Sequence, residues 1–138
     1  MNKELRTHLT KLQVVHFASS EYGQPRVRPV TLIYFDDRFF VATGSEDAKI
    51  KQVKHNNQVE LCLTLKDEKS TGYIRFAGIC KVIDDLQTKE YVMKEAEFIK
   101  QFWATADAPG FALLEITPEH AEYMPLGKME AKHFEINN

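Results

Sequence analysis

The chain has 138 residues, of which 43% are apolar and 28% charged, and its net charge is −2 at pH 7. This balance is typical of a soluble globular protein, and the length fits one domain, which we expect to span residues 1–138. No apolar run approaches the roughly 20 residues that a membrane-spanning helix needs, so no membrane partner is expected. The slightly acidic charge and the lack of a run of Lys or Arg argue against nucleic acid as a partner.

The first six residues are mostly polar and lack the apolar stretch of a secretory signal. The two cysteines, Cys62 and Cys80, each lie inside an apolar stretch. Buried, unpaired cysteines are common in reducing compartments. A cytoplasmic location is therefore expected.

Apolar spacing in the N-terminal half predicts one helix and then three strands. Leucines at spacings of four and three indicate a helix over residues 2–13. Strands are expected over residues 14–20, 26–35 and 38–43, the last two joined by a turn at Asp36 and Asp37.

A short helix is expected over residues 48–55, with Ser45 as its N-cap. Strict alternation predicts a half-buried strand over residues 59–65. A longer strand follows over residues 73–83, in which Gly78 indicates a bulge.

In the C-terminal part, Asp84 and Asp85 are suited to cap a helix, interrupted or continuous, that reaches Ala104. The last clear strand covers residues 111–117 and is expected to end at Pro118. The tail, residues 119–138, gives no firm assignment.

These elements predict a mainly β domain with inserted helices, because antiparallel hairpins dominate. The segment from Thr31 to Phe35 is apolar on both strand faces. A small closed barrel covers one face, and either a helix or a second subunit covers the other. We expect a barrel with a homodimer interface.

The stretch from Arg26 to Lys51 combines features that suit an anion. Arg26 and Arg28 lie two apart on a strand, so their side chains share a face, and a guanidinium suits bidentate contact with phosphate. Beyond the next strand, Thr43 and the turn after it open the short helix, which carries Lys49 in its second turn. A helix N-terminus offers unpaired N–H groups to anions. The alternative is that these arginines are solvated or pair with acids such as Glu60.

The same stretch resembles the pyridoxamine 5'-phosphate oxidase-like family of flavin mononucleotide (FMN) binding split barrels. The family pattern places an Arg in a Pro-x-x-Arg-x-Val strand, a Thr at the end of the next strand, and a Lys six residues later. A helix ending in Asn-x-x-Val follows. Here these are Pro25 to Val30, Thr43, Lys49, and Asn56 to Val59.

The resemblance implies a six-stranded antiparallel split β-barrel that binds FMN and forms homodimers with the flavin between subunits. Arg28 and Lys49 would hold the flavin phosphate. The remaining cofactor-binding positions implied are Pro29, Val30, Thr31, Thr43, Gly44 and Tyr73, although family members commonly have Gln where this chain has Tyr73.

The chain lacks the C-terminal Arg-x-His-x-Arg segment of the true vitamin B6 oxidases, since its last arginine is Arg75. Oxidation of that vitamin is therefore not expected. The expected function is FMN-dependent oxidation or reduction of an unidentified small molecule, and no catalytic acid or base is evident. The alternative is a flavin or haem carrier without turnover, and a third possibility is a barrel that has lost its cofactor. His120 and His133 lack the spacing of a metal site, so none is expected.

Overall fold

The computed structural model describes residues 1–136. The helices and strands, in chain order, are α1 (Lys3–Arg6), β1 (Leu12–Glu21), β2 (Gln24–Phe35), β3 (Arg38–Gly44), α2 (Ala48–His55), β4 (Gln58–Lys66), β5 (Thr71–Val82), α3 (Leu86–Glu95), the 3₁₀ helix η1 (Glu97–Gln101), β6 (Phe111–Met124) and β7 (Lys132–Glu135). Within this described part of the chain, no helix is both long and apolar enough to cross a membrane.

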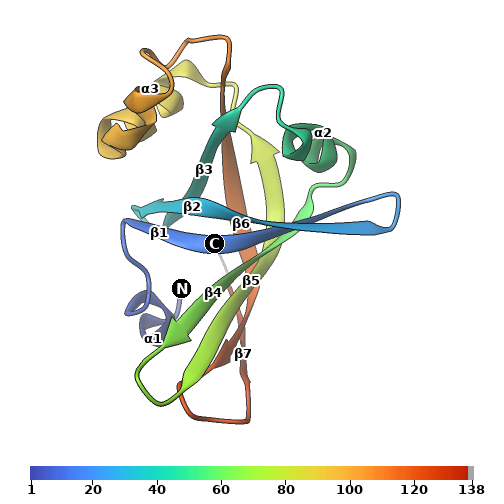
Figure 1. Cartoon of the computed structure of the whole chain (residues 1–138), viewed down its shortest axis with the longest axis vertical. Coiled ribbons are helices and arrows are strands. Elements are labelled where there is room, and N and C mark those ends of the chain that lie inside the picture. The colour runs from blue at the N-terminus through green and yellow to red at the C-terminus, as the bar shows by residue number, and fades with distance from the viewer. Residues whose placement is uncertain (137–138) are drawn as a thin grey trace.

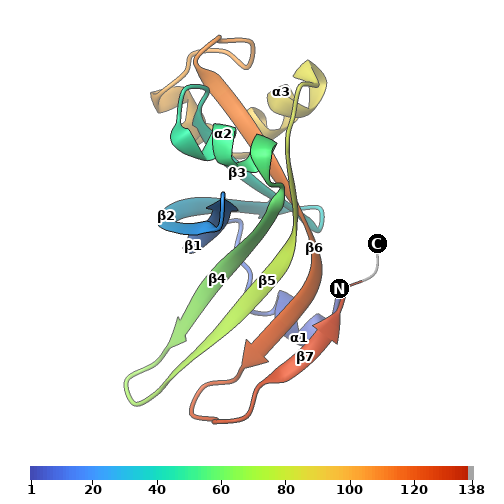
Figure 2. The same ribbon diagram turned by 90° about the vertical axis from the view of Figure 1, so that its right-hand side faces the viewer.

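All strands belong to one antiparallel sheet in the order β3-β2-β1-β4-β5-β6-β7. The sheet closes on itself because the first half of β6 also pairs with β3, with Phe39 opposite Ile116 and Gly44 opposite Phe111. The second half of β6 leaves β3 and carries β7 instead. The expected mainly β split barrel is confirmed, with one short strand more than the six predicted (Figures 1 and 2).

Two apolar clusters stabilise the fold. The first fills the barrel and includes Phe17, Leu32, Phe39, Leu61 and Phe76, all almost fully buried. The second lies between the barrel and the segment formed by α3 and η1, and its main members are Ile33, Phe40, Val92, Ile99 and Leu113.

Adjacent residues on β2 enter different clusters, since Leu32 belongs to the first and Ile33 to the second. The α3–η1 segment therefore covers the second apolar face of β2 at Ile33. The same outer face continues without cover toward the β1–β2 hairpin, where Val14 and Val27 are 66% and 69% exposed. Of the two apolar faces of β2, the outer one is therefore covered by helices at one end of the strand and left exposed at the other.

The N-terminal helix is shorter than its leucine spacing predicted, and the expected helix over residues 2–13 is wrong beyond Arg6. The carbonyl of Lys11 accepts a hydrogen bond from the backbone N–H of Tyr34 at 2.9 Å. Pairing with β2 therefore draws the chain into the sheet from Leu12 onward, because a strand pairing outweighs the weak intrinsic preference of a short helix.

The predicted stop at Pro118 is also wrong, because β6 runs on to Met124. Pro118 lies opposite Gly78, where the register of β5 and β6 shifts, as the predicted bulge requires. A proline is tolerated at such a bulge because one ladder hydrogen bond is already missing there. A Cβ on Gly78 would lie 2.1 Å from the Thr117 carbonyl oxygen, so only glycine fits.

Candidate functional site

Helix α2 packs against β1 and β5, and its first turn carries Lys49, one of the two cations of the site. Its N-cap is Asp47 and not Ser45, because the Asp47 side chain accepts a hydrogen bond from the backbone N–H of Lys49 at 2.9 Å. The Asp47 carbonyl accepts from the N–H of Ile50. Lys49 therefore lies in the first turn, one turn earlier than expected, and the chain itself already satisfies part of the helix N-terminus.

Lys49 is a buried cation, with an exposed fraction of 8%. Its Nζ donates to Thr43 Oγ1 at 2.8 Å and lies 2.9 Å from Asp47 Oδ1. Thr43 is itself 6% exposed and ends β3 just before the turn into α2. An ammonium group has three N–H donors, so these two partners leave one donor free for a ligand.

Arg28 extends from β2 toward the same helix. Its Nη1 donates to the Phe17 carbonyl at 3.2 Å and to Ser19 Oγ at 3.0 Å. Its Nη2 donates to Gln52 Oε1 at 2.5 Å, and the Ser19 hydroxyl donates to the same oxygen at 2.8 Å. Nε has no hydrogen-bond partner among residues 1–136.

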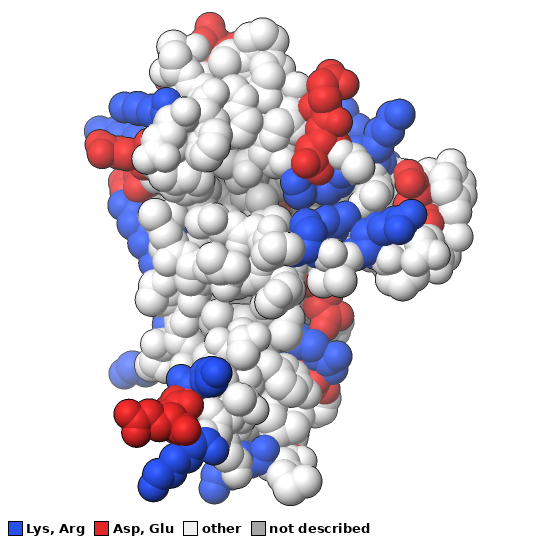
Figure 3. All heavy atoms as spheres, in the orientation of Figure 1, with Lys and Arg blue, Asp and Glu red and all other residues white. Residues whose placement is uncertain are grey.

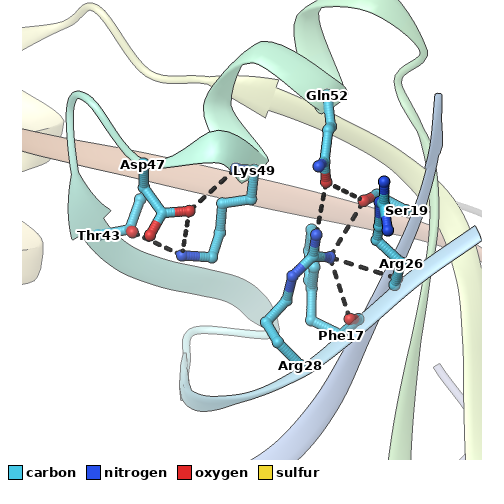
Figure 4. A network of polar contacts seen from close by, with 8 residues as sticks. All are labelled: Phe17, Ser19, Arg26, Arg28, Thr43, Asp47, Lys49 and Gln52. Carbon is cyan, nitrogen blue, oxygen red and sulfur yellow. Dashed lines mark hydrogen bonds and ion pairs between the residues drawn. The ribbon is translucent and has the colours of Figure 1, made fainter.

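We call these residues the Arg28–Lys49 cluster, which consists of Ser19, Arg28, Thr43, Asp47, Lys49 and Gln52. Both cations extend into the space between α2 and the strands below it (Figure 4). Figure 3 shows Lys and Arg side chains gathered on this side of the molecule, near α2 and the β1–β2 hairpin. The protein acceptors facing Arg28 are all neutral, so Asp47 is the single carboxylate in a cluster with two cations.

The pKa shifts agree with this arrangement. Burial lowers the pKa of Arg28, Asp47 opposes that shift and Arg26 adds to it, but an arginine stays charged at neutral pH. Burial alone would raise the pKa of Asp47, but the hydrogen bonds from Lys49 outweigh it, and the pKa of Asp47 is lowered. Both groups therefore carry their full charge at neutral pH.

The other positions predicted from the sequence lie on β2, at the end of β3 and on the surface. Pro29, Val30 and Thr31 continue β2 from Arg28, opposite His16, Val15 and Val14. Gly44 follows Thr43 at the end of β3. Arg26 and Lys51 are exposed, and Glu60 pairs with Arg75 rather than with Arg28.

Tyr73 is not brought to the cluster by its own chain. It lies near the start of β5, toward the β4–β5 hairpin, whereas α2 lies near the other end of the barrel (Figures 1 and 2). Its hydroxyl donates to Glu122 at 2.8 Å, and that bond raises the pKa of Tyr73.

Three residues of the cluster were not anticipated from the sequence: Ser19, Asp47 and Gln52. Gln52 follows Lys49 by three residues, so it shares a helix face with it, and this spacing was a usable signal. Ser19 enters because β1 pairs with β2, which places it opposite Arg26. No local pattern reveals such a pairing.

A separate groove of about 490 Å³ lies on the outer face of the sheet. It is bordered by Ser20 and Pro25 of the hairpin, Glu60 of β4, Ala77 of β5 and His120 of β6. Among residues 1–136, no group of three or more His, Cys, Asp or Glu side chains is placed to hold a metal ion.

Solved structures similar to this chain share its fold. A NimC/NimA family protein from Clostridium acetobutylicum is 24% identical with a TM-score of 0.78, covering 97% of this chain and 91% of that one. A FAD-binding protein from Mesorhizobium loti is 17% identical with a TM-score of 0.73, covering 91% and 93%. A haem-binding protein from Mycobacterium smegmatis is 9% identical with a TM-score of 0.71, covering 91% of this chain but 53% of that one.

A search of curated proteins finds no match to the sequence. The family model described as pyridoxamine 5'-phosphate oxidase matches residues 1–125, which is most of the chain. The chain therefore belongs to the pyridoxamine 5'-phosphate oxidase-like family.

Proposed function

We propose that the protein binds FMN and works as a small flavin-dependent oxidoreductase, with the flavin phosphate held by Arg28 and Lys49. The observation that carries this proposal is the excess positive charge of the Arg28–Lys49 cluster. Two partly or fully buried cations face one carboxylate, and each retains an unused donor. A phosphate supplies both the missing negative charge and the acceptors.

The rest of the cofactor would extend along β2. The backbone of Pro29, Val30 and Thr31 would line the flavin ring and ribityl chain, together with Thr43 and Gly44 at the end of β3. A bound flavin would supply transfer of one or two electrons, and the protein would supply orientation and exclusion of water.

A homodimer is part of this proposal. Val14 and Val27 leave an apolar area on the outer face of β1 and β2, and the middle of Figure 3, where these strands pass in front, carries few charges. Exposed apolar patches are common at subunit interfaces. Tyr73 lies on the outer face of the same sheet and would reach the flavin of the second copy. The groove beside Glu60 and His120 would take the small-molecule substrate at this interface.

The first experiment is a titration of the purified protein with FMN, followed by flavin fluorescence, with riboflavin as the ligand that lacks phosphate. FMN should bind more tightly than riboflavin. Saturation at about 100 times the dissociation constant should stabilise the fold by about 2.7 kcal/mol, which for a chain of this size raises the melting temperature by roughly 5–10 °C. Unchanged fluorescence and melting temperature would contradict the proposal.

Turnover separates the enzyme from a carrier on the same scaffold. An enzyme should accept electrons from a nicotinamide cofactor and pass them to a test acceptor, whereas a carrier should bind flavin without such a cycle. Haem is the second candidate ligand, favoured by the structural similarity to a haem-binding protein. A haem titration followed in the visible absorbance, in competition with FMN, decides between the two ligands.

A further inference from the structure

We propose that Asp47 is an internal counter-ion which weakens phosphate binding at the Arg28–Lys49 cluster and so makes the bound flavin exchangeable. This inference rests on the proposed function and concerns the regulation of the same site. It assigns Asp47 a role in setting affinity and not in the chemistry.

The geometry places the Asp47 carboxylate directly on the cation that the phosphate needs. Its Oδ1 lies 2.9 Å from Lys49 Nζ. The Lys49 side chain is 9% exposed and the Asp47 side chain 43% exposed, so the ammonium end of the pair is shielded from water while the carboxylate is partly screened. Figure 4 shows Lys49 Nζ directed toward Thr43 and Asp47, with the Arg28 guanidinium on the other side of the Lys49 side chain, near Ser19 and Gln52. The charge of Asp47 also reaches Arg28, since each group shifts the pKa of the other.

An incoming phosphate can bind Lys49 in two ways, and Asp47 lowers the phosphate affinity in both. If Asp47 stays in place, its negative charge repels the phosphate at short range. If the phosphate displaces Asp47, the ion pair with Lys49 must be broken first. In either case the affinity is lower than it would be with a neutral residue at position 47.

A purely structural role for Asp47 predicts the opposite effect of its replacement on FMN affinity. If the carboxylate only holds Lys49 in position and caps α2, replacing it should weaken binding. Asp47→Asn separates the two roles, because an asparagine oxygen can still accept the backbone N–H of Lys49 and cap the helix.

The matched control is Glu46→Gln, which removes the neighbouring charge. Glu46 is exposed and forms no ion pair within residues 1–136. Glu46→Gln therefore changes the net charge by the same amount as Asp47→Asn, but it removes no contact with Lys49.

The experiment measures the dissociation constants of FMN and riboflavin for the wild type, Asp47→Asn and Glu46→Gln by fluorescence titration, and the FMN release rate by stopped flow. Asp47→Asn should tighten FMN about ten-fold and slow its release, while riboflavin binding changes by less than about two-fold. Glu46→Gln should change both ligands little. If Asp47→Asn binds FMN equally or more weakly, the inference is wrong although the proposed function stands. If no variant, wild type included, binds FMN, the proposed function fails and this inference with it.

Discussion

Replacement of Arg28 by alanine tests whether this side chain is both a structural tie and a phosphate ligand. The change removes the donors for four acceptors, namely the Phe17 carbonyl, Ser19 Oγ, Gln52 Oε1 and, at 3.5 Å, the Arg26 carbonyl. Hydrogen bonds from a charged donor contribute about 1.5–3 kcal/mol when buried. Because Arg28 is only half-buried and water can replace part of the loss, we expect the free energy of unfolding to fall by about 1–3 kcal/mol in total.

The same change should also weaken the binding free energy of FMN by about 1–3 kcal/mol, which raises the dissociation constant roughly 5- to 150-fold. Riboflavin, which lacks the phosphate, should lose much less. The assay is a fluorescence titration with both ligands at a temperature well below the melting transition, with urea unfolding of the apoprotein measured in parallel.

Arg26→Ala is the matched control, because Arg26 lies two residues earlier on β2, has the same charge and is exposed. It should leave stability nearly unchanged and affect FMN binding only slightly. Equal losses of FMN affinity in Arg26→Ala and Arg28→Ala would refute the assignment of the phosphate to the Arg28–Lys49 cluster, since only general charge would then matter.

Three further predictions concern stability and reactivity. Gly78→Ala should destabilise the fold by about 1–3 kcal/mol in urea unfolding, because the new Cβ would lie 2.1 Å from the Thr117 carbonyl oxygen. A loss of stability below about 0.5 kcal/mol would mean that β5 and β6 separate easily at this point. Burial raises the pKa of the Cys80 thiol to about 12, and burial also raises the pKa of Cys62. A thiol reagent at pH 8 should therefore label Cys80 only after unfolding, and it should label Cys62 more slowly than a free thiol. Rapid labelling of both cysteines would contradict the burial. The lowered pKa of Asp47 stabilises the fold fully above its unfolded value of about 3.8, and this contribution disappears as the pH falls through the lower folded pKa. The apoprotein of Asp47→Asn should therefore melt below the wild type at pH 7, and the gap should close as the pH falls below about 4; a gap independent of pH would show that the charge of Asp47 is not involved.

Local pattern alone determined much of this protein. The alternation of β4 follows from burying one face of a pleated strand, and the hairpin after Phe35 follows from two aspartates, which tolerate the positive φ values of 52° and 56° observed there. The helix at Ala48–His55 and the cap of α3 at Asp85 follow from similarly short-range preferences. Spacing made Arg28 and Lys49 candidates for holding an anion, and the family resemblance singled them out. The structure places Arg28 in contact with β1 and α2, and Lys49 in contact with the end of β3.

Tertiary structure decided what depends on residues far apart in the chain. The pairing of β1 with β2 overrides the leucine periodicity after Arg6, and the bulge opposite Gly78 carries β6 through Pro118, where local rules predict a stop. The same long-range pairing brings Ser19 to Arg28, and the packing of α2 adds Gln52. A sequence pattern records the preferences of neighbouring residues, whereas the surroundings of a charge depend on which strands meet, so the cations could be predicted and most of their partners could not.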